Sequence, residues 1–79
     1  MRLGIYQHYN GNFYQVLSIA RHSETLEELV IYQALQGDYG VWARPLNMFK
    51  EKLNIDNKRI ERFKFVQENF LTVPEVKGK

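Results

Sequence analysis

The fold is decided by residues 3–22, LGIYQHYNGNFYQVLSIARH, in which Asn10-Gly11-Asn12 separates two apolar runs. Asn-Gly between such runs is the strongest short-range signal for a β-hairpin, because both residues tolerate a positive φ. We therefore predict strands over residues 3–9 and 13–22. The second strand is apolar on both faces in its middle (VLSIA), which indicates that it bends between the two halves of a small barrel.

The rest of the chain also reads as short strands separated by turns. The β-branched and aromatic residues predict further strands over residues 29–36, 41–44, 52–55 and 60–66. Residues 45–49 (PLNMF) fit a single helical turn with proline at its first position. Five to six short antiparallel strands with one helical turn predict an all-β fold, a small SH3-like barrel. An OB-like barrel is the second choice, because OB barrels usually carry a longer helix.

Composition narrows the class of protein further. The chain has 79 residues, of which 44% are hydrophobic and 25% charged, as in a single globular domain. We predict this domain over residues 1–67 and a frayed tail over residues 68–79. The absence of cysteine excludes disulfides, thiolate metal sites and a thiol nucleophile. No apolar run reaches the roughly 20 residues of a transmembrane helix and no signal peptide is evident, so we expect a cytoplasmic protein without membrane association.

The alternation of side chains predicts which residues form the core. Six apolar side chains should be deeply buried: Ile5, Val16, Leu17, Ile31, Phe49 and Phe63. In the last predicted strand Phe63 and Phe65 should point inward, while Arg62 and Lys64 point outward.

One cluster, residues 21–25 (RHSET), contains the side-chain types of a catalytic triad. Triad partners are assembled from separate elements, whereas adjacent residues of a strand point to opposite faces, so we predict no catalytic residue. A small enzyme centred on Arg21, His22 and Glu24 remains the second alternative. Together His8, His22 and Glu24 would supply only two imidazoles and one carboxylate on turns, so we predict no metal site and no cofactor.

Aromatic residues support a binding function better than catalysis. Six rings exceed what a small core needs: Tyr6, Tyr9, Tyr14, Tyr32, Tyr39 and Trp42. We predict a non-catalytic binding or interaction module with a cationic–aromatic groove formed by Arg21, His22, Tyr32, Trp42 and Arg44. The partner would be a peptide, a protein or a small anionic ligand. In the competing interpretation the rings fill the core and Arg44 pairs with Asp38 or Glu28 at the surface.

Basic residues provide the first alternative function. Residues 1–49 carry three basic and four acidic side chains, whereas residues 50–79 carry eight basic and five acidic ones. The local concentration consists of Lys58, Arg59, Arg62 and Lys64. A nucleic-acid-associated barrel would use this hairpin, but dedicated nucleic-acid binders usually show a denser basic stripe, so we do not favour it.

Two longer motifs resemble a known family. They are residues 20–25 (ARHSET) and residues 44–49 (RPLNMF), and the similarity extends over about residues 4–65. The sequence is similar to the small bacterial family known as domain of unknown function 1653. It departs from that pattern at Asn57, where a glycine is expected, but asparagine also tolerates the left-handed conformation that the turn needs. The resemblance implies a free-standing bacterial barrel domain and no established activity.

Overall fold

The computed structural model describes residues 1–68 and shows seven strands and one short helix in this part of the chain. In chain order the elements are β1 (Gly4–His8), β2 (Phe13–Arg21), β3 (Glu28–Ala34), β4 (Val41–Pro45), α1 (Leu46–Phe49), β5 (Lys52–Ile55), β6 (Lys58–Glu61) and β7 (Phe63–Gln67). The predicted all-β fold with one helical turn is confirmed. The predicted tail, apart from residue 68, lies outside the described residues.

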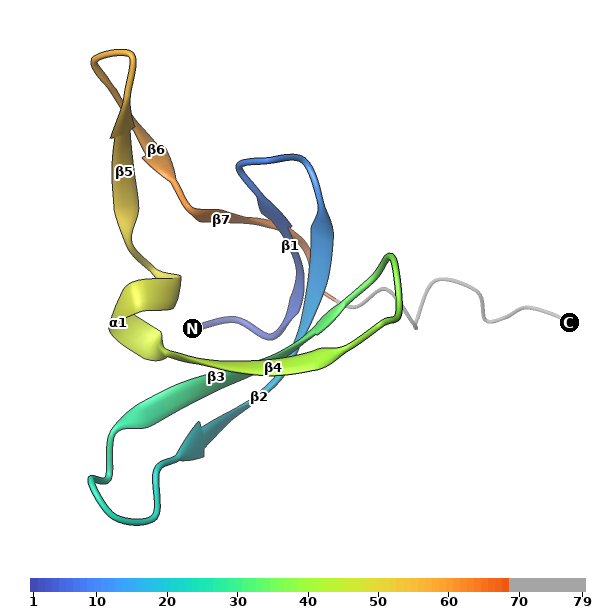
Figure 1. Cartoon of the computed structure of the whole chain (residues 1–79), viewed down its shortest axis with the longest axis vertical. Coiled ribbons are helices and arrows are strands. Elements are labelled where there is room, and N and C mark those ends of the chain that lie inside the picture. Colours follow the sequence, from blue (N-terminus) through green and yellow to red (C-terminus); the bar gives the residue numbers. More distant parts are fainter. Residues whose placement is uncertain (69–79) are drawn as a thin grey trace, which may run out of the picture.

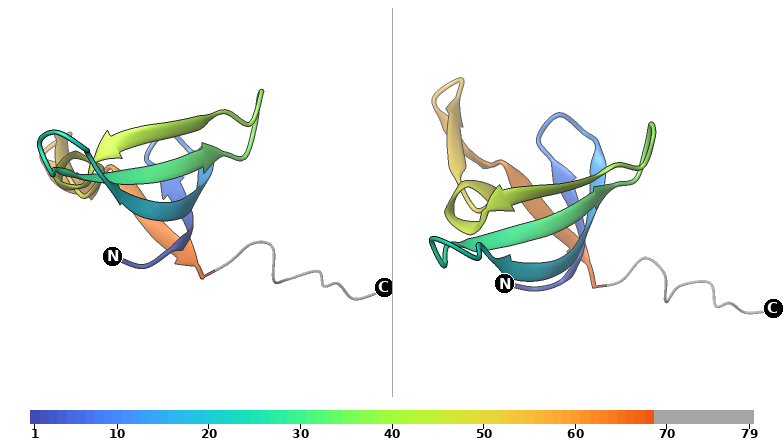
Figure 2. Two further views of the ribbon diagram at one scale, coloured as in Figure 1. Left: turned by 90° about the horizontal axis from the view of Figure 1, so that it is seen from below. Right: turned by 60° about the horizontal axis from the view of Figure 1, so that its bottom comes forward.

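Five strands form one curled antiparallel sheet in the order β4-β3-β2-β1-β7, and β5 pairs with β6 in a separate hairpin (Figure 1). Figure 2 shows α1 at one end of the curved sheet, where it packs against β3 and β4. Within residues 1–68 the sheet does not close, because β4 and β7 remain its two edges. The small all-β fold is therefore as predicted, but it is not a closed barrel in this part of the chain. No helix in this part of the chain is long and apolar enough to span a membrane.

The predicted first hairpin is confirmed, and its turn has the expected chemistry. The pairing of Tyr6 with Tyr14 sets the register of β1 and β2. Gly11 has a φ of 102°, and the Asn10 side chain accepts a hydrogen bond from the Asn12 amide at 2.9 Å. The second hairpin also forms as its sequence predicts, since Asp56 and Asn57 both adopt a positive φ without a glycine.

The predicted strand over residues 60–66 is two strands, which raises the number of strands from six to seven. β6 pairs with β5, whereas β7 pairs with β1. The change of partner occurs at Arg62, whose amide donates to the Glu51 carbonyl and whose carbonyl accepts from the Tyr9 amide, both at 3.0 Å. Backbone pairing on both sides of Arg62 therefore bends the chain between the hairpin and the sheet.

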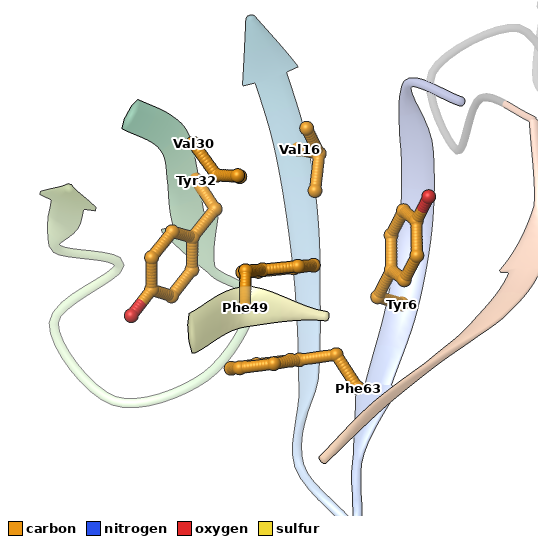
Figure 3. Close-up of a cluster of buried hydrophobic side chains, with 6 residues drawn as sticks. All are labelled: Tyr6, Val16, Val30, Tyr32, Phe49 and Phe63. Carbon is orange, nitrogen blue, oxygen red and sulfur yellow. The ribbon is translucent and has the colours of Figure 1, made fainter. Parts of the chain in front are cut away.

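The core lies on the inner face of the sheet. It contains six buried side chains: Tyr6, Val16, Val30, Tyr32, Phe49 and Phe63. The rings of Phe49 and Phe63 stack with their centroids 4.1 Å apart at an angle of 3°, with Tyr32 on one side and Tyr6 on the other (Figure 3). Helix α1 therefore contributes to the core mainly by placing Phe49 between aromatic side chains of the sheet.

Four of the six predicted core residues are buried, namely Ile5, Val16, Phe49 and Phe63. The predictions for Leu17 and Ile31 are wrong. The register of β2 shifts between Val16 and Ser18, so Leu17 is the extra residue of a bulge and is 40% exposed. Beyond the bulge Ser18 pairs with Ile31, which leaves Ile31 half-buried on the outer face.

Candidate functional site

Strands β3 and β4 place three of the predicted site residues together. Tyr32 pairs directly with Trp42, and Val30 pairs with Arg44. Directly opposite residues of an antiparallel pair share one face of the sheet. Because Val30 and Tyr32 belong to the core, Trp42 and Arg44 also lie on the inner face. Trp42 is nevertheless 59% exposed, since β4 is an edge strand. We call Tyr32, Trp42 and Arg44 the arginine–aromatic face.

The guanidinium group of Arg44 is oriented by aromatic side chains. Its Nε donates a hydrogen bond to the Tyr32 hydroxyl at 3.3 Å, and its central carbon lies 5.8 Å from the centroid of the Phe63 ring. The residue is half-buried, so part of its hydration has been replaced by aromatic contacts. The terminal N–H groups, which form the fork that suits a carboxylate, are not used in these contacts.

No carboxylate neutralises Arg44 within residues 1–68. The two ion pairs in this part of the chain join Arg2 to Glu68 and Arg62 to Glu51. The surface pairing of Arg44 with Asp38 or Glu28 does not occur in the structure. The Asp38 carboxylate instead accepts a hydrogen bond from the Gly40 amide at 3.0 Å and closes the β3–β4 turn. Arg44 is therefore a half-buried cation with unused donors.

Several aromatic rings pack against the residues of the arginine–aromatic face. The Tyr14 ring lies 5.6 Å from both Tyr32 and Phe63, in edge-to-face geometry. His8 extends the series, with its ring 4.8 Å from Phe63 and 6.3 Å from Tyr14. These contacts pack other rings against Tyr32 and Phe63, the two side chains that Arg44 contacts.

His8 belongs to the surroundings of Arg44, a position that the sequence did not reveal. Burial lowers the pKa of His8, the side chain of Asn10 partly offsets this effect, and the positive charges of Arg62 and Arg44 lower the pKa further. The Nδ1 atom accepts a hydrogen bond from the backbone N–H of Asn10 at 3.2 Å. At neutral pH the ring is therefore mostly uncharged, with its proton on Nε2. The positive charge of this region comes from the arginines.

The structure does not bring Arg21 and His22 to the arginine–aromatic face. Arg21 pairs with Glu28, which lies four residues along β3 from Tyr32, about 13 Å at 3.3 Å per residue. His22 lies in the β2–β3 turn, where its Nδ1 accepts hydrogen bonds from the amides of Glu24 and Thr25 at 3.1 and 3.3 Å. The His22 side chain therefore stabilises this turn, while Arg21 is the last residue of β2.

The three residues of the metal hypothesis do not come together in the structure. His8 lies at the end of β1 beside β7, whereas His22 and Glu24 lie in the β2–β3 turn. In the described part of the chain no group of three histidine, aspartate or glutamate side chains is placed to hold a metal ion.

The four basic residues of the alternative site differ in their surroundings. The Arg62 side chain is only 22% exposed and bonds Glu51 at 3.0 Å, so its guanidinium is engaged in an ion pair. Its Nε is buried and has no hydrogen-bond partner within the described residues. Arg59 and Lys64 line a hollow of about 410 Å³ together with His8 and Tyr9. Lys58 is exposed in the β5–β6 hairpin.

Both the sequence and the fold of this chain are similar to those of a known protein family. Residues 4–65 match the sequence model of a family described as "Protein of unknown function (DUF1653)". The fold is similar to a crystal structure of a DUF1653 protein from Bordetella bronchiseptica, with 34% sequence identity and a TM-score of 0.77. The match covers 84% of this chain and 87% of that chain. A search of curated proteins found no match.

Proposed function

The chain belongs to the DUF1653 family, whose function is unknown, and we propose that it is a non-catalytic binding module whose arginine–aromatic face binds a carboxylate-bearing partner. The observation that carries this proposal is the state of Arg44. Its guanidinium is half-buried, fixed by Tyr32 and without an acidic partner within residues 1–68.

In this arrangement the Arg44 side chain needs little rearrangement when an anion binds. A guanidinium fork forms two parallel charge-assisted hydrogen bonds with a carboxylate, and these are about twice as strong as neutral ones. The hydrogen bond to Tyr32 already restricts the rotamers of Arg44, which lowers the entropy lost on binding. The exposed indole of Trp42 offers a stacking surface on the same face for a ring or an apolar side chain.

We expect benzoate to bind at this face, while benzamide, its neutral counterpart of the same shape, does not. Backbone amide shifts measured by NMR during both titrations report the site residue by residue. The proposal predicts benzoate-dependent shifts concentrated at Tyr32, Trp42 and Arg44, together with a change in the fluorescence of the single tryptophan. Equal responses to benzoate and benzamide, or shifts elsewhere only, would contradict it.

A second candidate function is nucleic-acid binding, and one observation favours it. Arg59 and Lys64 line the same hollow as Tyr9, which combines cations with an aromatic ring as single-strand binders do. A single-stranded oligonucleotide that shifts the amides of residues 58–64, with an affinity that falls steeply with salt, would support this function.

Two further properties, the extent of the domain and its location in the cell, are also proposed. We propose that residues 1–67 form one binding domain, an open relative of the SH3-like barrel, and that it acts in the bacterial cytoplasm. The cysteine-free composition is compatible with a reducing compartment. Separation of a host lysate into soluble and membrane fractions, followed by detection of the protein, tests the location.

A further inference from the structure

We infer that the partner is an extended peptide that adds an antiparallel strand to the free edge of β4, with an apolar side chain opposite Trp42 and a carboxylate opposite Arg44. This inference rests on the proposed function, because it uses the same face. It adds the class of partner, the backbone groups that bind it and the spacing of its side chains.

The register of β3 and β4 shows which backbone groups of β4 face outward. The Ala34 amide donates to the Gly40 carbonyl at 2.8 Å, one pair beyond the end of β3. In an antiparallel ladder, hydrogen-bonded and non-hydrogen-bonded pairs alternate. The pairs that contain Trp42 and Arg44 are therefore hydrogen-bonded to β3, whereas Val41 and Ala43 direct their N–H and C=O groups away from the sheet.

Strand β4 ends in Pro45 and carries the inward-facing charge of Arg44, which both protect an edge strand, but residues 41–43 have no such protection. Natural sheets protect their edges with charged side chains, proline, bulges or a covering element. Three consecutive uncharged residues, Val41, Trp42 and Ala43, are exposed, and Val41 and Trp42 are 56% and 59% exposed. The opposite edge strand, β7, carries Lys64 in its second position. Within residues 1–68 no other strand pairs with the outer side of β4.

An added strand would bring its side chains close to Trp42 and Arg44. If the peptide hydrogen-bonds to Val41 and Ala43, the residues opposite Trp42 and Arg44 form the close, non-hydrogen-bonded pairs, with Cα atoms about 4.5 Å apart. Both residues lie on the inner face and are two positions apart. A suitable peptide therefore carries an apolar or aromatic residue two positions after an aspartate or glutamate, when it runs antiparallel to β4.

A second copy of this chain fits the same edge less well. The sequence of β4, VWARP, contains no acidic residue. Pairing of two β4 strands would therefore place no strand carboxylate opposite Arg44, and its charge would stay uncompensated. Charge complementarity favours an acidic peptide over a dimer of two edge strands.

The test uses an acetylated, amidated hexapeptide with glutamate at its second position, phenylalanine at its fourth, and threonine or valine elsewhere. In the antiparallel register its third residue faces Ala43 and its fourth faces Trp42. Methylation of the third backbone nitrogen removes a donor that points toward β4, whereas methylation of the fourth removes one that points away. The two methylated peptides differ only in the position of one N-methyl group, so each is the control for the other.

We expect the unmodified peptide to bind and to protect the amides of Val41 and Ala43 from hydrogen exchange. Methylation of the third nitrogen should weaken binding at least about tenfold, and methylation of the fourth by less than about threefold. Replacing the glutamate of the peptide with glutamine should also weaken binding at least about tenfold.

The outcomes separate this inference from the proposed function. If benzoate binds at Arg44 but the two methylated peptides bind equally, strand addition is wrong and the binding face stands. If neither benzoate nor the peptide binds, both are wrong. If sedimentation equilibrium shows a dimer without peptide, with Val41 and Ala43 protected, the occupant of the edge is a second copy and the inference is overturned.

Discussion

Replacing Phe63 with alanine is expected to lower the free energy of unfolding by about 3–5 kcal/mol. Phe63 is 6% exposed and stacks on Phe49, with edge-to-face contacts to Tyr14, Tyr32 and His8. The other rings cannot collapse into the vacated space without losing these contacts. A domain of this size has only about 5–15 kcal/mol of stability, so the loss would remove much of it. Urea unfolding followed by circular dichroism measures the difference.

The matched control for Phe63→Ala is Phe13→Ala, which deletes the same ring from the start of β2. Phe13 is 40% exposed, so its removal should cost less than about 1.5 kcal/mol. Similar losses for the two variants would mean that the stacked pair is not the centre of the core.

Replacing Gly4 with alanine is the second substitution with a large expected effect, about 2–6 kcal/mol. Gly4 has a φ of 137°, a conformation that side chains strongly disfavour at about 1–3 kcal/mol. A Cβ atom would also overlap the backbone carbonyl oxygens of Gln67 and Glu68, which adds a similar cost of overpacking. The substitution would therefore disturb the pairing of β1 with β7, next to the register shift between Ile5 and Tyr6.

Gly11→Ala is the control that separates the two costs at Gly4. Gly11 also has a positive φ, of 102°, but no atom lies within 4 Å of the place its Cβ would take. Its substitution should therefore cost only the conformational strain. Thermal unfolding of both variants is the measurement, and a Gly11→Ala variant as unstable as Gly4→Ala would contradict the steric part of the argument.

Local signals in the sequence were sufficient to predict most strands and the hairpin pairings, but not the separation of β6 from β7 or the pairing of β7 with β1. The Asn-Gly turn and the alternation of apolar residues predict the first hairpin, because a hairpin depends on neighbouring residues. The bulge that exposes Leu17 and the change of partner at Arg62 depend on which strand lies alongside. Pairing between distant segments leaves no short-range signal, so the open edges of the sheet could not be predicted either.

The part of the candidate site that depends on hairpin pairing could be predicted, whereas the part that depends on long-range pairing could not. The spacing of Trp42 and Arg44 on one strand predicts that they share a face, and hairpin pairing brings Tyr32 beside them. His8 reaches the region of Arg44 through β1 and β7, a long-range arrangement that its sequence neighbours do not indicate. Arg21 and His22 were included because cationic side chains suit an anion site, but the hairpin places them near its other end.

The most direct test of the account is the dissociation constant of benzoate for the Arg44→Lys variant, measured by the fluorescence of Trp42. Lysine keeps the charge but lacks the planar fork, so we expect binding to weaken at least about fivefold. Arg21→Lys, the same change at the other end of the sheet, should alter the dissociation constant by less than about twofold. If Arg44→Lys binds benzoate as tightly as the unmodified protein, Arg44 does not form the anion site and the central claim is wrong.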